Sequence, residues 1–133
     1  MKIAADGPIY RPGCLHDKAR DPTTMTTHYV ETEPRREEVE GLAGPSLLEF
    51  GSPWCGYCRA AEPLLERALA GHPDVRHIKV HDASGRRLGR SFRVKLWPTL
   101  VFLRDGSEVA RLVRPSDAQA IGEALDRIDA RHA

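Results

Sequence analysis

The sequence predicts an α/β fold, a single domain with a central mixed β-sheet flanked by helices. Short apolar runs typical of buried strands alternate with segments of helical periodicity, in the order βαβαβαββα. Near the end, Asp105-Gly106 separates two strand-like runs and predicts an antiparallel hairpin. The 133 residues leave room for one hydrophobic core.

The first expected unit, residues 1–27, is an irregular N-terminal extension, because prolines and glycines recur in it without helical or strand periodicity. Cys14 lies in this extension, and we interpret it as an unpaired, exposed thiol. The domain itself is expected to span residues 28–133.

The first expected elements of the domain are a strand, a helix and a strand. His28–Glu31 has the length of a short strand. Thr32 is expected to cap a helix with Pro34 in its first turn, and Gly44-Pro45 ends it. Ser46–Gly51 is a short apolar run of the kind that forms a buried strand.

A longer helix is expected to open at the Cys55 to Cys58 segment and to end before Gly71. Its apolar residues recur at helical spacing: Ala61, Leu64, Leu65, Ala68 and Leu69. Val75–His81 alternates as a strand, and Ser84–Phe92 reads as a modest basic helix.

The last expected elements are the hairpin strands and one more helix. Pro98–Leu103 and Glu108–Val113 form the hairpin. Ser116 with Gln119 predicts a capping box at the start of the final helix. Its apolar face carries Ala120, Ile121, Ala124, Leu125 and Ile128.

The pair Cys55 and Cys58 is the strongest chemical signal. At a strand-to-helix junction, unpaired backbone N–H groups and the helix dipole favour a thiolate on the first cysteine. We therefore expect Cys55 to attack a substrate disulfide and Cys58, one turn further in, to resolve the mixed disulfide. Half a zinc site is the alternative, but no second close pair of ligands is present in the sequence, so no metal is expected.

Composition bounds the partners and the compartment. The formal net charge is +1, which gives no reason to expect nucleic acid, and no apolar run approaches the roughly 20 residues of a membrane span. Charged residues interrupt the first 25 positions, so no secretory signal is expected and the chain should remain cytoplasmic, where thiols stay reduced.

Phe50–Cys58 (Phe-Gly-Ser-Pro-Trp-Cys-Gly-Tyr-Cys) resembles the active-site segment of the thioredoxin and protein disulfide isomerase superfamily. Pro63 matches that family's proline in the active-site helix, and Trp97-Pro98-Thr99 resembles its cis-proline loop. The resemblance runs from His28 to the last helix. It implies a thioredoxin-like fold, with a cis bond before Pro98 and Pro98 facing the cysteines.

Two further roles are implied by the resemblance. Glu49, six positions before Cys55, matches a buried acid that relays protons for the resolving thiol; the alternative is a carboxylate that is solvated at a rim. His77 stands where thioredoxins have a lysine that pairs with this acid, but we interpret it as a surface-strand histidine.

The substrate-binding surface follows from the same resemblance. Trp54 is expected to pack over the active site, and Trp97, where thioredoxins carry isoleucine, is either a lid over the docking groove or a residue at the rim of the core. The expected substrate-binding residues are Trp54, Gly56, Tyr57, Trp97, Pro98 and Thr99.

The sequence departs from thioredoxin in two places. Gly56-Tyr57 replaces Gly-Pro between the cysteines, so we expect the freed N–H of Tyr57 to bond the Cys55 thiolate and make the disulfide more oxidising. The family's glycine in the docking surface after the hairpin is also missing, and Val113 and Arg114 occupy that region, a departure that bears on recognition by thioredoxin reductase.

The predicted function is a thiol–disulfide oxidoreductase that reduces protein or small-molecule disulfides as a monomer. It needs no bound cofactor besides the Cys55–Cys58 disulfide, and its electron donor is thioredoxin reductase or glutathione. The alternatives are an exported disulfide oxidase or isomerase, and a non-catalytic binding module or chaperone on the same scaffold.

Overall fold

The computed structural model of the chain describes residues 28–84 and 86–130, so the expected extension of residues 1–27, including Cys14, lies outside the described residues. The described part contains four main strands and four helices, which follow one another along the chain. The strands are β2 (Pro45–Gly51), β3 (Arg76–His81), β4 (Thr99–Arg104) and β5 (Ser107–Val113). The helices are α1 (Arg36–Glu40), α2 (Gly56–Leu69), α3 (Arg87–Ser91) and α4 (Ala118–Ile128).

The four strands form one mixed sheet in the order β3-β2-β4-β5. Strand β2 is parallel to β3 and antiparallel to β4, and β4 and β5 form the predicted antiparallel hairpin. Both turn residues, Asp105 and Gly106, have positive φ angles of 51° and 82°. A side chain at Gly106 would collide with the backbone of Glu40, so this turn requires glycine for space as well as for conformation.

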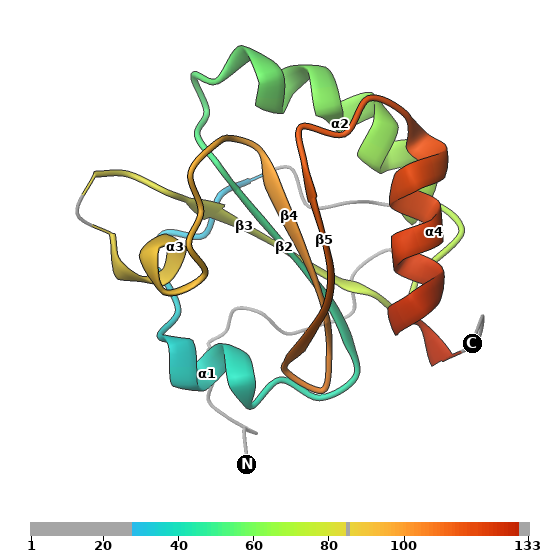
Figure 1. The fold of residues 1–133 in the computed structure, drawn as a ribbon, viewed down its shortest axis with the longest axis horizontal. Coiled ribbons are helices and arrows are strands. Elements are labelled where there is room, and N and C mark those ends of the chain that lie inside the picture. Colours follow the sequence, from blue (N-terminus) through green and yellow to red (C-terminus); the bar gives the residue numbers. More distant parts are fainter. Residues whose placement is uncertain (1–27, 85, 131–133) are drawn as a thin grey trace.

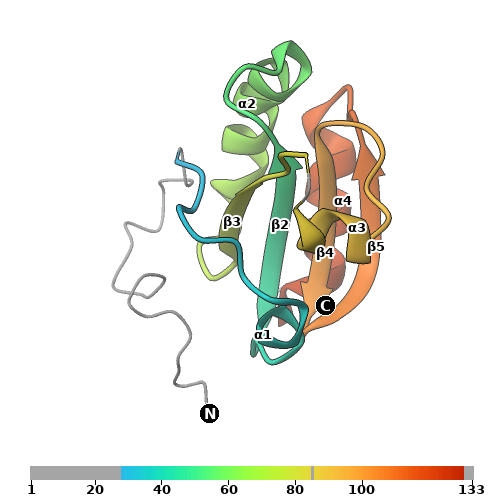
Figure 2. The ribbon, with the colours of Figure 1, turned by 90° about the vertical axis from the view of Figure 1, so that its left-hand side faces the viewer.

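Helices cover both faces of the sheet (Figures 1 and 2). On one face, α2 and α4 pack their apolar sides on a core that contains Leu47, Leu65, Phe102 and Leu125. On the other face, α1 and α3 cover a second core that contains Val39, Phe50, Leu88 and Val101. Because successive residues of β2 alternate between these cores, its side chains are buried on both faces. The predicted α/β architecture is thus confirmed.

The first expected elements are shorter than the sequence suggested. The strand expected over His28–Glu31 is reduced to one parallel bridge between Tyr29 and Lys79, because the chain bends away at Glu31 towards α1. The prediction of Thr32 as a helix cap is wrong, since α1 begins at Arg36.

Pro34, expected in the first turn, precedes α1. The N–H of Arg35 instead donates to the Oε1 atom of Glu38 over 2.9 Å, which satisfies an N–H group at the helix start.

The start of α4 is also shifted by one residue from the prediction. Asp117, and not Ser116, is the cap: its Oδ1 atom accepts the N–H of Ala120 over 2.8 Å. Serine and aspartate are about equally good caps, so the sequence alone does not distinguish two adjacent candidates. Gln119 bonds Glu123, one turn further along, rather than the cap backbone.

In the described ranges 28–84 and 86–130, no helix has the length and apolar character that crossing a lipid bilayer requires.

Candidate active site

The two cysteines lie at the junction between β2 and α2, at the upper end of the sheet in Figure 1. Cys55 has extended backbone angles and is the N-cap of α2, and its Sγ atom accepts the N–H of Cys58 over 3.1 Å. Both thiols are free, so the structure is the dithiol form. Cys55 is half-buried, whereas Cys58 is only 2% exposed. The first thiol is therefore accessible and the second is shielded.

The donor on the Cys55 sulfur differs from the one expected. The N–H of Cys58 makes this bond, one residue later than the N–H of Tyr57 that the missing proline was expected to free. A proline at position 57 would leave the Cys58 donor in place. The structure therefore gives no support to the argument that Gly56-Tyr57 makes the disulfide more oxidising through that N–H.

Cys58 lies in surroundings that keep it protonated. Burial, followed by a hydrogen bond with Cys55, raises the pKa of the Cys58 thiol from its usual value near 9 to about 12. The negative charge of Glu49 acts in the same direction. Gly51 makes room for the sulfur, because a Cβ atom there would lie 2.5 Å from Cys58 Sγ.

Tyr29 reaches the same point from the segment before α1. A Cβ atom on Gly51 would lie 3.3 Å from its hydroxyl oxygen, so the hydroxyl and the Cys58 sulfur meet beside Gly51. Burial and the hydrogen bond with Cys58 raise the pKa of Tyr29, and the Nζ atom of Lys79 lies 4.6 Å from the centre of its ring. The sequence did not indicate Tyr29 as a site residue. It is positioned by a single β-bridge to Lys79, and one bridge leaves no periodic pattern in the sequence.

Glu49 and His77 form a buried pair. The Nε2 atom of His77 lies 2.9 Å from Glu49 Oε1, and neither side chain is exposed. The interpretation of His77 as a surface histidine was therefore wrong. Glu49 is buried as expected, and the alternative of a solvated rim is excluded. The parallel register sets Leu47 beside His77 and Glu49 beside Lys79, so the acid and the histidine meet diagonally on one face.

The second oxygen of the carboxylate, Glu49 Oε2, is buried without a hydrogen-bond partner in the described part of the chain. Buried polar atoms are rarely left in this state, and they concentrate at sites where a proton or a water molecule must come and go. Glu49 is thus anchored through one oxygen, and the other is available for a proton.

The loop before β4 is held from several sides. The peptide bond between Trp97 and Pro98 is cis, as predicted. The indole Nε1–H of Trp97 donates to Asp82 Oδ2 over 3.0 Å, which ties this loop to the end of β3. Thr99 is buried, and its hydroxyl donates to the carbonyl of Leu96 over 2.6 Å, so its side chain supports the loop and is not open to a substrate.

Two aromatic side chains flank Cys55 on the outside. Trp54 is 76% exposed and Tyr57 is 59% exposed, high fractions for aromatic residues. The centre of the Trp54 ring lies 5.7 Å from that of His81, at the end of β3. A Cβ atom on Gly56 would meet nothing within 4 Å, so the backbone between the two rings is open.

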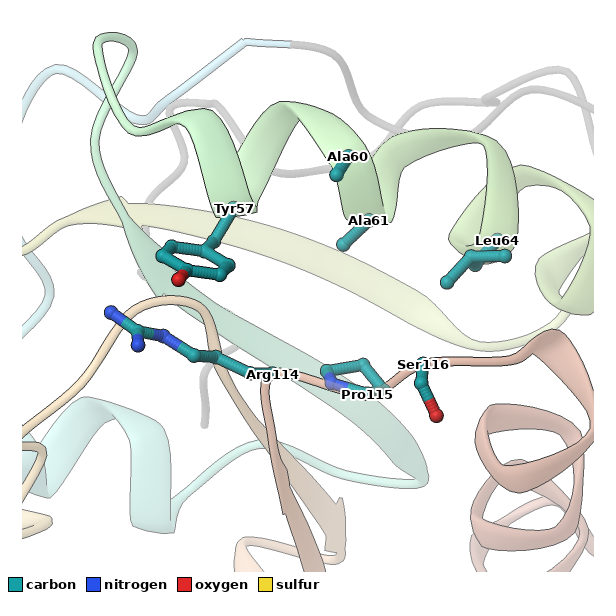
Figure 3. Close-up of a pocket in the computed structure, with 7 residues that line it drawn as sticks. All are labelled: Tyr57, Ala60, Ala61, Leu64, Arg114, Pro115 and Ser116. Atoms are coloured by element: carbon teal, nitrogen blue, oxygen red, sulfur yellow. The ribbon is translucent and has the colours of Figure 1, made fainter.

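Arg114 lies against this surface from the other side. Its guanidinium is stacked 3.8 Å from the centre of the Tyr57 ring, and its Nε–H donates to the carbonyl of Trp97 over 2.8 Å. A cleft of about 300 Å³ opens beside the stacked pair, as Figure 3 shows. The sequence had marked position 114 only as a departure from the family glycine.

Among the described residues, no group of three or more histidine, cysteine or acidic side chains is arranged to hold a metal ion.

Comparisons with known proteins place this geometry in one family. The family model described as Thioredoxin matches residues 26–127. The thioredoxin of Chlamydia pneumoniae is 32% identical over 85 residues, which cover 64% of this chain and 83% of that protein. Human protein disulfide-isomerase A2 is 38% identical over 87 residues, which cover 61% of this chain and 17% of the human protein.

Among solved structures, thioredoxin 2 from Pseudomonas aeruginosa PAO1 in its reduced form is similar, with a TM-score of 0.71 and 57% identity. The match covers 78% of this chain and 96% of that one. A thioredoxin mutant from Halobacterium salinarum shares the fold, with a TM-score of 0.66 at 23% identity.

Proposed function

This chain belongs to the thioredoxin family and is a dithiol–disulfide oxidoreductase, and we propose that it reduces protein disulfides with Cys55 as nucleophile and Cys58 as resolving thiol. The observation that carries this division of roles is the contrast between the two sulfurs. Cys55 is accessible and its sulfur accepts a backbone N–H, a bond that strengthens when the sulfur is a thiolate. Cys58 is buried beside an acid and holds its proton.

The proposed cycle has two exchange steps. The Cys55 thiolate attacks one sulfur of the substrate disulfide, forms a mixed disulfide and displaces the first substrate thiolate, which takes up a proton. Cys58 then loses its proton and attacks Cys55 Sγ. The Cys55–Cys58 disulfide forms, the second substrate thiolate leaves, and two electrons have passed from the dithiol to the substrate.

Glu49 is the proposed acceptor of the Cys58 proton. Two observations support this role: the charge of Glu49 disfavours the Cys58 thiolate, and its Oε2 atom has no hydrogen-bond partner among the described residues. His77 holds the other oxygen and fixes the orientation of the carboxyl. A water molecule could bridge Glu49 and Cys58 during the transfer.

Substrates are proposed to dock as an extended segment across the exposed surface around Cys55. Trp54 and Tyr57 supply exposed contact area on either side of Gly56. The proposed opposite edge is the half-buried Trp97 with the backbone that leads into the buried Pro98. Thr99 acts in this proposal only by supporting the loop.

The remaining partners are proposed from the family. Thioredoxin reductase or glutathione returns electrons to the Cys55–Cys58 disulfide, and the protein works as a monomer in the cytoplasm. The pair itself carries the electrons, so the cycle requires no further cofactor.

Single cysteine variants test the roles. Reduced Cys58→Ser should form a stable mixed disulfide with a protein disulfide such as insulin, visible by non-reducing electrophoresis and mass spectrometry. Cys55→Ser should form none. Insulin reduction at the wild-type rate by both variants would show that this pair does not perform the reaction.

A further inference from the structure

The backbone of Arg114 adopts a conformation that favours glycine. Its φ angle is +51°, in the left-handed region, where a side chain costs conformational energy that glycine avoids. Its N–H donates to the carbonyl of Pro98 over 2.9 Å, which fixes the strained residue against the cis-proline loop. Strain of this kind persists only where the surrounding structure holds the residue in place, and it is common at ligand-binding sites.

The side chain occupies a place that a docking substrate needs. The Nε–H of Arg114 donates to the carbonyl of Trp97, directly before Pro98. An extended peptide that adds along this edge would use such backbone groups for its own hydrogen bonds. A substrate that pairs with the Trp97 carbonyl must therefore displace Arg114 from it.

The positive charge of Arg114 is not neutralised by a neighbouring acid in residues 28–84 and 86–130. Arg111, three residues earlier in β5, is paired with Glu108 over 2.7 Å, and Arg36 with Glu40 over 3.2 Å. In contrast, no carboxylate of the described residues lies within 4 Å of the Arg114 guanidinium. Its ring partner, Tyr57, brings no carboxylate to the guanidinium. A guanidinium so placed can accept a carboxylate on two nitrogens at once.

The cleft beside Arg114 matches a side chain with an apolar stem and an acidic end. Its wall is largely apolar and is formed by Ala60, Ala61, Leu64 and Pro115, and the stacked guanidinium lies at one end of it (Figure 3). Its volume of about 300 Å³ is sufficient for one side chain of a docked peptide.

From these contacts we propose that Arg114 makes the protein selective for disulfide substrates with a glutamate or aspartate near the cysteine under attack. The inference rests on the proposed function and names the substrate class of the same site. A substrate carboxylate draws the guanidinium away from Trp97 and leaves that carbonyl for the substrate backbone. A neutral or basic substrate breaks the bond between Arg114 and Trp97 without replacing it.

The test uses three disulfide-bonded peptides that differ only in the residue after one cysteine, which is Glu, Gln or Lys. The rate constant measured is that for oxidation of the reduced, full-length protein by each peptide. The Glu peptide should react about fivefold faster than the Gln peptide, the range of an exposed ion pair, and the Lys peptide should be slowest. The difference should shrink at high salt.

Variants at position 114 distinguish a role of Arg114 in substrate choice from a merely structural role. Arg114→Gly should remove the preference for the Glu peptide and increase the rate with the Gln peptide, because the Trp97 carbonyl is then free. Arg114→Gln, which keeps a side chain, should also remove the preference. Lys95→Gln removes one exposed positive charge before the same loop and is the matched control; it should preserve the order of the three peptides.

The outcomes separate the two proposals. Equal rates for the three peptides with the wild-type protein would overturn the selectivity and leave the reductase function intact. A preference that survives in both Arg114 variants, or is lost equally in Lys95→Gln, would also overturn the role of Arg114. If no peptide oxidises the protein, the proposed function itself is wrong.

Discussion

The sulfurs of Cys55 and Cys58 belong to one turn of helix but to two different regions of the molecule. Cys55 opens onto what we call the docking face, formed by the side chains of Trp54, Tyr57, Trp97 and Arg114. Cys58 points into the inner polar cluster, formed by Tyr29, Glu49, His77 and Lys79. The docking face is exposed and held by loops. The inner polar cluster lies between β2, β3 and α2 and is mostly buried.

One motif thus separates two tasks, substrate choice and proton transfer. Side chains on the docking face are exposed to water and to partner proteins. They can therefore be substituted at small cost to stability, and they decide which substrates are accepted. Groups in the inner polar cluster are paired within a sheet, where the loss of one partner leaves another buried and unsatisfied. Substitutions in the inner polar cluster should therefore affect stability and proton transfer. Substitutions on the docking face should affect the choice of substrate.

The largest effect is expected from breaking the buried pair of Glu49 and His77, whose Oε1 and Nε2 atoms lie 2.9 Å apart. His77→Leu leaves the Glu49 carboxyl without its partner and should reduce the free energy of unfolding by about 3–5 kcal/mol, measured by urea denaturation. His28→Leu, at an exposed position, is the control. Adding Glu49→Gln to His77→Leu should recover part of the loss, because the buried charge is then removed. A loss below about 1 kcal/mol in His77→Leu would contradict the pairing.

A smaller effect is expected from filling the space beside Cys58. Gly51→Ala places a methyl group 2.5 Å from Cys58 Sγ, so the free energy of unfolding should fall by about 1–3 kcal/mol. Gly122→Ala is the matched control, because a Cβ atom there meets nothing within 4 Å and alanine favours a helix by about 1 kcal/mol. If both substitutions stabilise the protein, the packing around Cys58 is looser than described.

The next effect is a pH dependence specific to the dithiol form. Cys58 keeps its proton in the folded state up to about pH 12, whereas the unfolded chain loses it near pH 9. Its contribution to stability is therefore complete below pH 9 and is lost as the pH rises from 9 towards 12, by at most about 1.4 kcal/mol per pH unit. The measurement compares unfolding of the reduced wild type and Cys58→Ala across this range. Parallel curves would contradict the raised pKa.

The smallest effect is expected from Tyr29→Phe, which removes the hydroxyl beside Cys58 and keeps the ring under Lys79. Loss of one hydrogen bond should cost about 1 kcal/mol of stability. The distinguishing readout is kinetic. Stopped-flow measurements should show a change in the step in which Cys58 resolves the mixed disulfide, with the initial attack by Cys55 unchanged. Tyr57→Phe on the docking face should alter the free energy of unfolding by less than about 0.5 kcal/mol. A larger loss would contradict the contrast between the docking face and the inner polar cluster.

The parts of the molecule that the sequence predicted are those with a local pattern. The apolar run of Ser46–Gly51, the helical spacing after Cys58 and the Asp105-Gly106 turn each predicted an element that the structure contains. Cys55 at a helix start and the cis bond before Pro98 followed from short motifs. Where several residues suited one task, as Ser116 and Asp117 did for the cap, the position was missed by one.

The parts that the sequence did not predict depend on contacts between distant segments. The pairing of His77 with Glu49 follows from the register of β2 against β3, which local periodicity does not determine. Tyr29 is brought to Cys58 by the single β-bridge between Tyr29 and Lys79. Arg114 stacks on Tyr57 from a position after β5 where its own backbone is left-handed. These residues carry charges or hydroxyls that are ordinary in the sequence and acquire meaning only from the fold.

The bridge between Tyr29 and Lys79 protects an edge of the sheet from pairing with other copies of the protein. Strand β3 is the outermost strand on its side of the sheet, and bare outer strands attract strands of other molecules. At this edge of the sheet, the N–H of Val30 donates to the Lys79 carbonyl over 2.9 Å and so occupies a backbone acceptor of β3. At the opposite edge, β5 carries the charged pair Glu108 and Arg111. A chain shortened beyond Val30 would bare β3 and should aggregate, even with its redox pair intact.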